Sequence, residues 1–162
     1  MPSKVKTILG IDPGFHRMGY GVIESIGSKI KMIDYGSTET SKTKKIGERI
    51  LEITCVLREL IKQYKPDSLI LEELFFFKNA TTIINVAQAR GAIILVAEEC
   101  GVPVIELTPL QVKQSVTGYG RADKGQVQRM VKTLLSLKEI PKPDDAADAL
   151  AMAIAGSSWV KY

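Results

Sequence analysis

The feature of this sequence that most constrains its fold is a change of periodicity near residue 45. Before it, three stretches with the character of strands (5–11, 19–24 and 30–35) are joined by short connections, which predicts an antiparallel meander. After it, apolar residues recur at helical spacing over 46–64, and Lys65-Pro66-Asp67 ends that helix. The chain therefore begins as a sheet and continues with helices.

The rest of the chain alternates strands and helices. A short buried strand (68–73), a long apolar helix (80–100) and a fifth strand (102–107) follow in order. Thr108-Pro109 and the pair Asp123 and Gln126 are typical of helix starts, and an alanine-rich helix comes last. The order βββαβαβααα predicts an α/β protein with a mixed five-stranded sheet and helices on its faces, as in the ribonuclease H-like fold. No linker divides the chain, so we expect one domain over 1–162.

Composition excludes some classes of protein. With 45% hydrophobic and 25% charged residues, the chain has the balance of an ordinary globular domain, and no apolar run reaches the ~20 residues of a membrane span. The start of the chain lacks the plan of a signal peptide, so we expect a cytoplasmic protein without a membrane partner. Cys55 and Cys100 lie among aliphatic residues, which predicts buried thiols rather than a disulfide. The net charge of +4 is compatible with a polyanionic partner.

Acidic residues end two of the apolar strands. Asp12 closes "TILGID", and "SLILEE" ends in Glu72 and Glu73, between which alternation cannot choose because a buried strand has two covered faces. In the expected sheet the first and fourth strands are parallel neighbours, so their acids would meet. On the last helix Asp145 and Asp148 are three residues apart and share a face. The plainer alternative is a turn former, a surface acid and exposed acids at a helix start.

Carboxylates brought together from three elements favour a metal site. Such groups repel one another, and each has its pKa raised unless cations lie between them. Their hard oxygen atoms suit Mg²⁺ or Mn²⁺, and two such ions can hold the attacking water and the leaving oxygen of a phosphodiester. This would explain why an apolar strand ends on Asp12 with no basic residue before Arg17.

Five motifs in register give the chain a resemblance to a known family. The stretches "GIDPG", "LEELFF", "QARG", "QVKQSVTGYGRADKGQVQ" and "DDAADALA" resemble the RuvC-type Holliday junction resolvases, in order from about Ile8 to Ala155. The resemblance implies a homodimeric, Mg²⁺-dependent endonuclease that nicks two strands of like polarity across a four-way DNA junction. It also implies a role in recombination and repair, and a branch-migration helicase complex as partner.

The resemblance assigns roles to individual residues. It selects Glu72 over Glu73 and implies that the catalytic and metal-binding acids, for two Mg²⁺ ions that Mn²⁺ can replace, are Asp12, Glu72, Asp145 and Asp148. Lys113 and Lys124 match family lysines near the scissile phosphate, and Phe75 matches an aromatic residue that stacks on bases. Arg121, in the glycine-rich "GYGRADK" stretch, is expected to contact DNA.

Two other functions fit parts of the pattern. An actin-like ATP-binding protein also uses a strand followed by Asp-x-Gly, but it needs two such lobes and a second phosphate loop. A junction-binding module without catalysis would keep the fold but need not keep all four acids. We expect His16 to be exposed and not a ligand. For Arg90 the alternative to a role in the site is a salt bridge within the dimer. Lys42, Lys44 and Lys45 are expected to lie in a solvated loop, with contact to DNA as the alternative.

Overall fold

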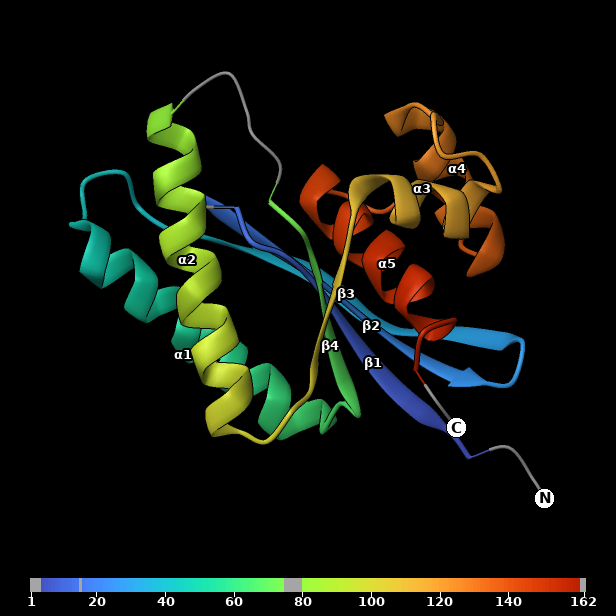
Figure 1. The fold of residues 1–162 in the computed structure, drawn as a ribbon, viewed down its shortest axis with the longest axis horizontal. Coiled ribbons are helices and arrows are strands. Elements are labelled where there is room, and N and C mark those ends of the chain that lie inside the picture. Colours follow the sequence, from blue (N-terminus) through green and yellow to red (C-terminus); the bar gives the residue numbers. More distant parts are fainter. Residues whose placement is uncertain (1–3, 15, 75–79, 161–162) are drawn as a thin grey trace.

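The computed structural model describes residues 4–14, 16–74 and 80–160, and one mixed sheet forms its centre (Figure 1). The sheet has the order β3-β2-β1-β4-β5. Antiparallel pairs join the first three strands, and parallel pairs join β1 to β4 and β4 to β5. The strands are β1 (Lys6–Asp12), β2 (Arg17–Ile26), β3 (Lys29–Glu39), β4 (Ser68–Glu72) and β5 (Val104–Leu107). The expected meander, the parallel crossovers and the ribonuclease H-like order are confirmed.

Helices cover both faces of this sheet. Figure 1 shows α1 and α2 on one side of the strands and α3, α4 and α5 on the other. The helices are α1 (Ile46–Tyr64), α2 (Ala80–Glu99), α3 (Pro109–Thr117), α4 (Lys124–Leu134) and α5 (Asp144–Ser157). No helix of the described residues is long and apolar enough to cross a membrane.

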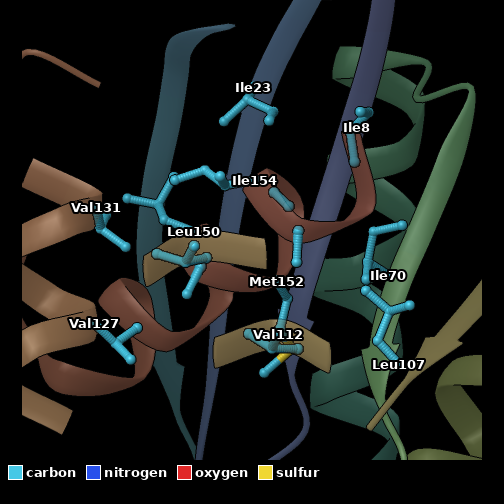
Figure 2. Packing of buried hydrophobic residues seen from close by; sticks show 14 of the residues in the cluster. Ile8, Ile23, Ile70, Leu107, Val112, Val127, Val131, Leu150, Met152 and Ile154 are labelled. Atoms are coloured by element: carbon cyan, nitrogen blue, oxygen red, sulfur yellow. The ribbon is translucent and has the colours of Figure 1, made fainter. Parts of the chain in front are cut away.

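The alternation of side chains along the strands creates two cores. Ile8 and Ile70 point to the face of α5, where they join the cluster drawn in Figure 2 with residues of α3, α4 and α5. Leu9 and Leu71 point to the opposite face and pack with residues of α1 and α2. Because both faces of β1 and β4 are buried, a charged side chain can be exposed only where these strands end.

Helix α5 lies unusually close to the sheet because glycines face it. A Cβ atom added to Gly10 would lie 2.0 Å from the carbonyl oxygen of Ala149, and one added to Gly19 would lie 2.1 Å from that of Asp145. Only glycine leaves room for the helix backbone at these two points. The alanines of α5 complete the close contact, so the acids on this helix are held near the ends of β1 and β2.

Local signals set the limits of the helices. The Thr108 side chain accepts a hydrogen bond from the Gln111 N–H group, and Gly118, with φ 74°, ends α3. The capping box of Asp123 and Gln126 begins α4, as predicted.

The prediction that the cysteines are buried is wrong. Both thiols are free and exposed. Cys55 lies two residues from each of the core residues Ile53 and Leu57, so it faces away from them on the outer side of α1.

Candidate active site

The ends of two parallel strands bring the first two acids together. Ile11 of β1 is paired with Leu71 of β4, and the next residue along each strand is Asp12 or Glu72. Both carboxylates therefore leave the sheet at the same edge, as the sequence predicts. Glu73 instead extends the strand pairing, since its N–H group donates to the Leu107 carbonyl oxygen at 2.8 Å.

A pocket of about 230 Å³ opens at this edge, between the sheet, α3, α4 and α5. Its charged lining consists of three carboxylates and two ammonium groups, each from a different element: Asp12, Glu72, Asp148, Lys113 and Lys124. Pro109, Val112, Val127, Ala151 and Met152 form its apolar wall. The structure thus gathers five of the predicted site residues around one space, which we call the acidic pocket.

Burial and mutual repulsion raise the pKa of the carboxylates in this pocket. The pKa of Asp12 rises to about 8, first because the group is buried and then because Asp148, Asp145 and Glu72 lie near it. Burial, followed by Asp148, also raises the pKa of Glu72, while Lys113 opposes this shift. Burial raises the pKa of Asp148 as well, against the effect of Lys124. The pocket holds more negative charge than its lysines neutralise.

Lys124 bridges two acids of the last helix. Its Nζ atom lies 3.2 Å from Oδ2 of Asp144 and 3.3 Å from Oδ2 of Asp148. Burial lowers the pKa of Lys124, but these carboxylates, Asp148 first, raise it overall. Asp144 also accepts a hydrogen bond from Nε2 of Gln128 at 3.3 Å. One ammonium group is therefore shared between a pocket carboxylate and an exposed one.

Asp145 lies at the border of the acidic pocket rather than in its lining. Its charge raises the pKa of Asp12, so the two carboxylates are close. However, Asp145 lines a neighbouring hollow, where its Oδ2 atom lies 3.5 Å from Nη1 of Arg17. Arg17 also approaches Glu39, with Nη2 3.7 Å from Oε1. This arginine at the start of β2 is a neighbour of the site that the sequence analysis did not assign.

Arg90 of α2 supports the end of β4 from behind. Its Nε atom donates to the carbonyl oxygen of Glu72 at 3.3 Å, and its Nη2 atom lies 2.6 Å from Oε1 of Glu106. The arginine of "QARG" thus ties α2 to the two parallel strands β4 and β5 within one chain. The sequence motif marked this residue but not its partners, because they are distant along the chain.

The remaining predicted site residues lie elsewhere. Phe75 falls outside the described residues. Arg121 is exposed in the turn between α3 and α4, and it does not line the acidic pocket.

The donor atoms of the acidic pocket fit a hard divalent cation. They are carboxylate oxygens that carry excess negative charge, which is the preference of Mg²⁺ and Mn²⁺. Among the described residues, no three acidic, histidine or cysteine side chains already lie at the spacing of a metal site. The carboxylates repel one another, and two of them are held by cations: Asp148 by Lys124 and Asp145 by Arg17. The acidic groups therefore lie near one another but do not form a closed coordination sphere.

The sheet order and the acids at the ends of β1 and β4 and on α5 define the chain as a nuclease of the ribonuclease H-like class. A family model described as crossover junction endodeoxyribonuclease RuvC matches residues 8–156. The chain belongs to the RuvC family.

Individual relatives agree with this membership. The crossover junction endodeoxyribonuclease RuvC of Petrotoga mobilis is 56% identical over 90% of each chain, and that of Caldicellulosiruptor saccharolyticus is 55% identical over 96% of each. The structure of RuvC from T. thermophilus in complex with a Holliday junction substrate has a TM-score of 0.90 and 35% identity, covering 95% of this chain and 94% of that one. The yeast mitochondrial Holliday junction resolvase Ydc2, at 15% identity and a TM-score of 0.68, shares the fold.

Proposed function

We propose that this chain is a Mg²⁺-dependent endonuclease that resolves four-way DNA junctions by hydrolysing two phosphodiester bonds symmetrically during recombination and repair. The observation that supports it most directly is the acidic pocket, where carboxylates from β1, β4 and α5 surround one space together with two lysines. Membership of a family of DNA-hydrolysing nucleases supports the reaction. RuvC from T. thermophilus was solved in complex with a Holliday junction substrate, which supports the choice of DNA.

In this proposal Asp12, Glu72, Asp145 and Asp148 hold two divalent ions. Bound there, such ions activate a water molecule and stabilise the leaving oxygen of the phosphodiester. The role of the chain is to hold these carboxylates close together at the edge of the sheet. The raised pKa of Asp12 means that an ion and this carboxylate stabilise each other, because the ion replaces the proton that the buried group otherwise retains.

The two lysines would act on the phosphate. Lys113 lies across the pocket near Glu72, and its charge lowers the pKa of that carboxylate. Lys124 has Asp144 as a second partner, so it can leave Asp148 and still keep an ion pair. Both ammonium groups can then neutralise the scissile phosphate and the charge that develops on it. Phe75 would stack on an unpaired base at the junction centre, and Arg121 would contact the DNA backbone.

A symmetric pair of nicks requires two sites, hence a twofold dimer. Helix α2 offers a surface for this contact. Its exposed positions include Ile84 and Leu95, which are 58% and 59% exposed. Gln88 and Gly91 lie between them, at spacings of four, three and four residues along the helix. Nothing lies within 4 Å of a Cβ atom built on Gly91, so a second helix can approach closely there. We propose that α2 packs against its counterpart in the dimer.

The partners of the whole molecule follow from this assignment. Four-way junction DNA is the substrate, and the resemblance of the sequence motifs supports a branch-migration helicase complex that delivers it. We propose the cytoplasm as its location, as the sequence predicts.

The test is a nuclease assay on a synthetic four-way junction, with and without Mg²⁺. Expected is a pair of symmetric nicks that needs the ion and is lost in Asp12→Asn, Glu72→Gln and Asp148→Asn, while the matched variant Glu73→Gln remains active. Cleavage by the Asp12 variant at the wild-type rate would refute the assignment of the site. A chain that binds the junction and never cuts it would instead be the non-catalytic module.

A further inference from the structure

Lys124 is a cation in an unfavourable place on its own helix. It is the first residue of α4, where the positive end of the helix dipole disfavours an ammonium group. Two carboxylates of α5 nevertheless hold its Nζ atom there, at 3.2 Å from Oδ2 of Asp144 and 3.3 Å from Oδ2 of Asp148. These acids are four residues apart, so they share one face of α5, which packs beside α4 (Figure 1). The contacts across the two helices therefore fix Lys124 at the acidic pocket.

The two partners of Lys124 differ in their surroundings. Asp148 lines the acidic pocket, and its side chain is 32% exposed. Asp144 lies outside that lining, and its side chain is 66% exposed. A metal ion held in the pocket can therefore take Asp148 as a ligand, whereas Asp144 remains a partner for the ammonium group.

Gln128 fixes the direction of the Asp144 carboxylate. It lies one turn after Lys124 on α4, and its Nε2 atom donates to Oδ1 of Asp144 at 3.3 Å. Lys124 approaches the other oxygen, Oδ2. Both oxygens of Asp144 are thus engaged by one face of α4, so this acid is oriented toward Lys124 rather than toward the ions of the acidic pocket.

We propose that Asp144 is a positioning residue, which holds Lys124 at the acidic pocket while Asp148 serves as a metal ligand. This inference rests on the proposed function, because it takes Asp148 as a ligand and Lys124 as a group that neutralises the scissile phosphate. Among the described residues, Asp144 and Asp148 are the ion-pair partners of Lys124. Without Asp144, Lys124 would pair with Asp148 alone and compete with the ion for that carboxylate.

The first experiment measures the binding of the metal alone, without DNA. Mn²⁺ is titrated into each variant, and the free ion is followed by electron paramagnetic resonance. Asp144→Asn keeps an acceptor for Gln128 and should remain folded in thermal melts, but it should bind Mn²⁺ about tenfold more weakly, as expected for a group behind a metal ligand. Asp144→Glu should restore most of the affinity. The control Glu73→Gln removes the same charge beside Glu72 and should bind Mn²⁺ like the wild type.

A double variant separates positioning from the effect of charge alone. In Lys124→Gln there is no ammonium group to hold, so adding Asp144→Asn should change the Mn²⁺ affinity by less than about twofold. Single-turnover cleavage of a four-way junction at saturating Mg²⁺ should follow the same pattern: Asp144→Asn should slow it in the presence of Lys124 and have no further effect in Lys124→Gln. The affinity of Asp144→Asn for the junction in EDTA should stay that of the wild type, since Lys124 keeps its charge.

Equal Mn²⁺ affinities of Asp144→Asn and the wild type would overturn the proposal. So would the same loss of affinity with and without Lys124, because Asp144 would then act through its charge alone. A wild type that shows the coupling in Mn²⁺ binding but never cuts a four-way junction would instead refute the proposed function, so the two failures are distinguishable.

Discussion

Asp12 is the residue in which the conflict between folding and function is most evident. It ends an apolar strand, and burial together with Asp148, Asp145 and Glu72 raises its pKa to about 8. A carboxylate in such surroundings destabilises the ionised apo protein unless a cation accompanies it. The same surroundings that make this group unfavourable without an ion make it a strong ligand for one. Lys124 is paired with Asp148, and Arg17 is paired with Asp145. These two cations neutralise the acids around Asp12 only in part.

The substitution Asp12→Asn tests this residue alone. We expect cleavage to fall by more than about a hundredfold, since even groups behind metal ligands contribute 10–100-fold. Binding of the junction should be retained, because the change removes no positive charge that attracts the phosphates. Single-turnover cleavage and binding in EDTA, measured on the same preparation, separate the two effects. Loss of binding together with cleavage would mean that Asp12 is structural.

At the scale of the element, α5 determines where the acids lie. It contacts the sheet through its own alanines and through Gly10 and Gly19 of the strands, so small residues on both sides allow a close approach. Two of its acids then reach different spaces: Asp148 lines the acidic pocket, and Asp145 lines the neighbouring hollow beside Arg17. Helix α2 has the complementary role, since one side supports β4 through Arg90 and the other exposes Ile84 and Leu95.

We expect Gly10→Ala to destabilise the fold by about 1–3 kcal/mol, the usual effect of excess volume in a packed core. The new methyl group would overlap the carbonyl oxygen of Ala149 and push α5 away from β1. Urea denaturation measures the free energy of unfolding, and Gly47→Ala is the matched control because that exposed position on α1 is open and lies outside the proposed dimer contact. Equal stability of Gly10→Ala and the wild type would contradict the close packing of α5.

The proposed dimer makes a separate prediction for α2. Leu95→Glu places a charge in the middle of the proposed contact, so sedimentation should show a monomer at concentrations where the wild type is a dimer. Leu51→Glu is the control, because Leu51 is 61% exposed on α1, outside the proposed contact. The monomeric variant should lose the coordination of the two nicks. A wild type that is monomeric at micromolar concentration and still cuts symmetrically would refute the dimer.

At the scale of the whole molecule, the acidic pocket couples stability to pH. The folded-state pKa of Asp12, Glu72 and Asp148 is raised, so the folded apo protein holds protons that the unfolded chain has released. Their contribution to stability is present below the ordinary carboxylate pKa and is lost as pH rises; for Asp12 this window runs from 3.8 to about 8. Asp67 and Asp144 have lowered pKa values, so their contribution to stability is present above the ordinary carboxylate pKa and is lost only as the pH falls below it.

Melting temperatures in EDTA should therefore fall from pH 5 to pH 8.5, and fall less in Asp12→Asn. Mg²⁺ should raise the melting temperature at pH 8.5 and have little effect at pH 5, because its ligands must be deprotonated and it stabilises only the state that binds it. The informative quantity is the difference between the Mg²⁺-induced shifts in melting temperature at pH 8.5 and at pH 5. Equal stabilisation by Mg²⁺ at both would argue against ligands with raised pKa.

The sequence alone determined what depends on short-range stereochemistry. The two periodicities, the caps at Thr108 and Asp123 and the glycine at 118 predict the elements, and their order predicts the sheet. The acids at the strand ends follow from this order, because the carboxyl ends of parallel neighbours lie at one edge. Motif resemblance chose Glu72 over Glu73, which periodicity could not.

Only the tertiary structure decided which side chains meet across the chain. The pairs of Asp145 with Arg17, of Lys124 with Asp144 and Asp148, and of Arg49 with His16 join segments that no local pattern relates. Exposure of the cysteines likewise depends on which side of a helix faces the sheet. The physical reason is that these contacts arise from how closely α1 and α5 pack on the strands, and such packing depends on all the residues at the contact together.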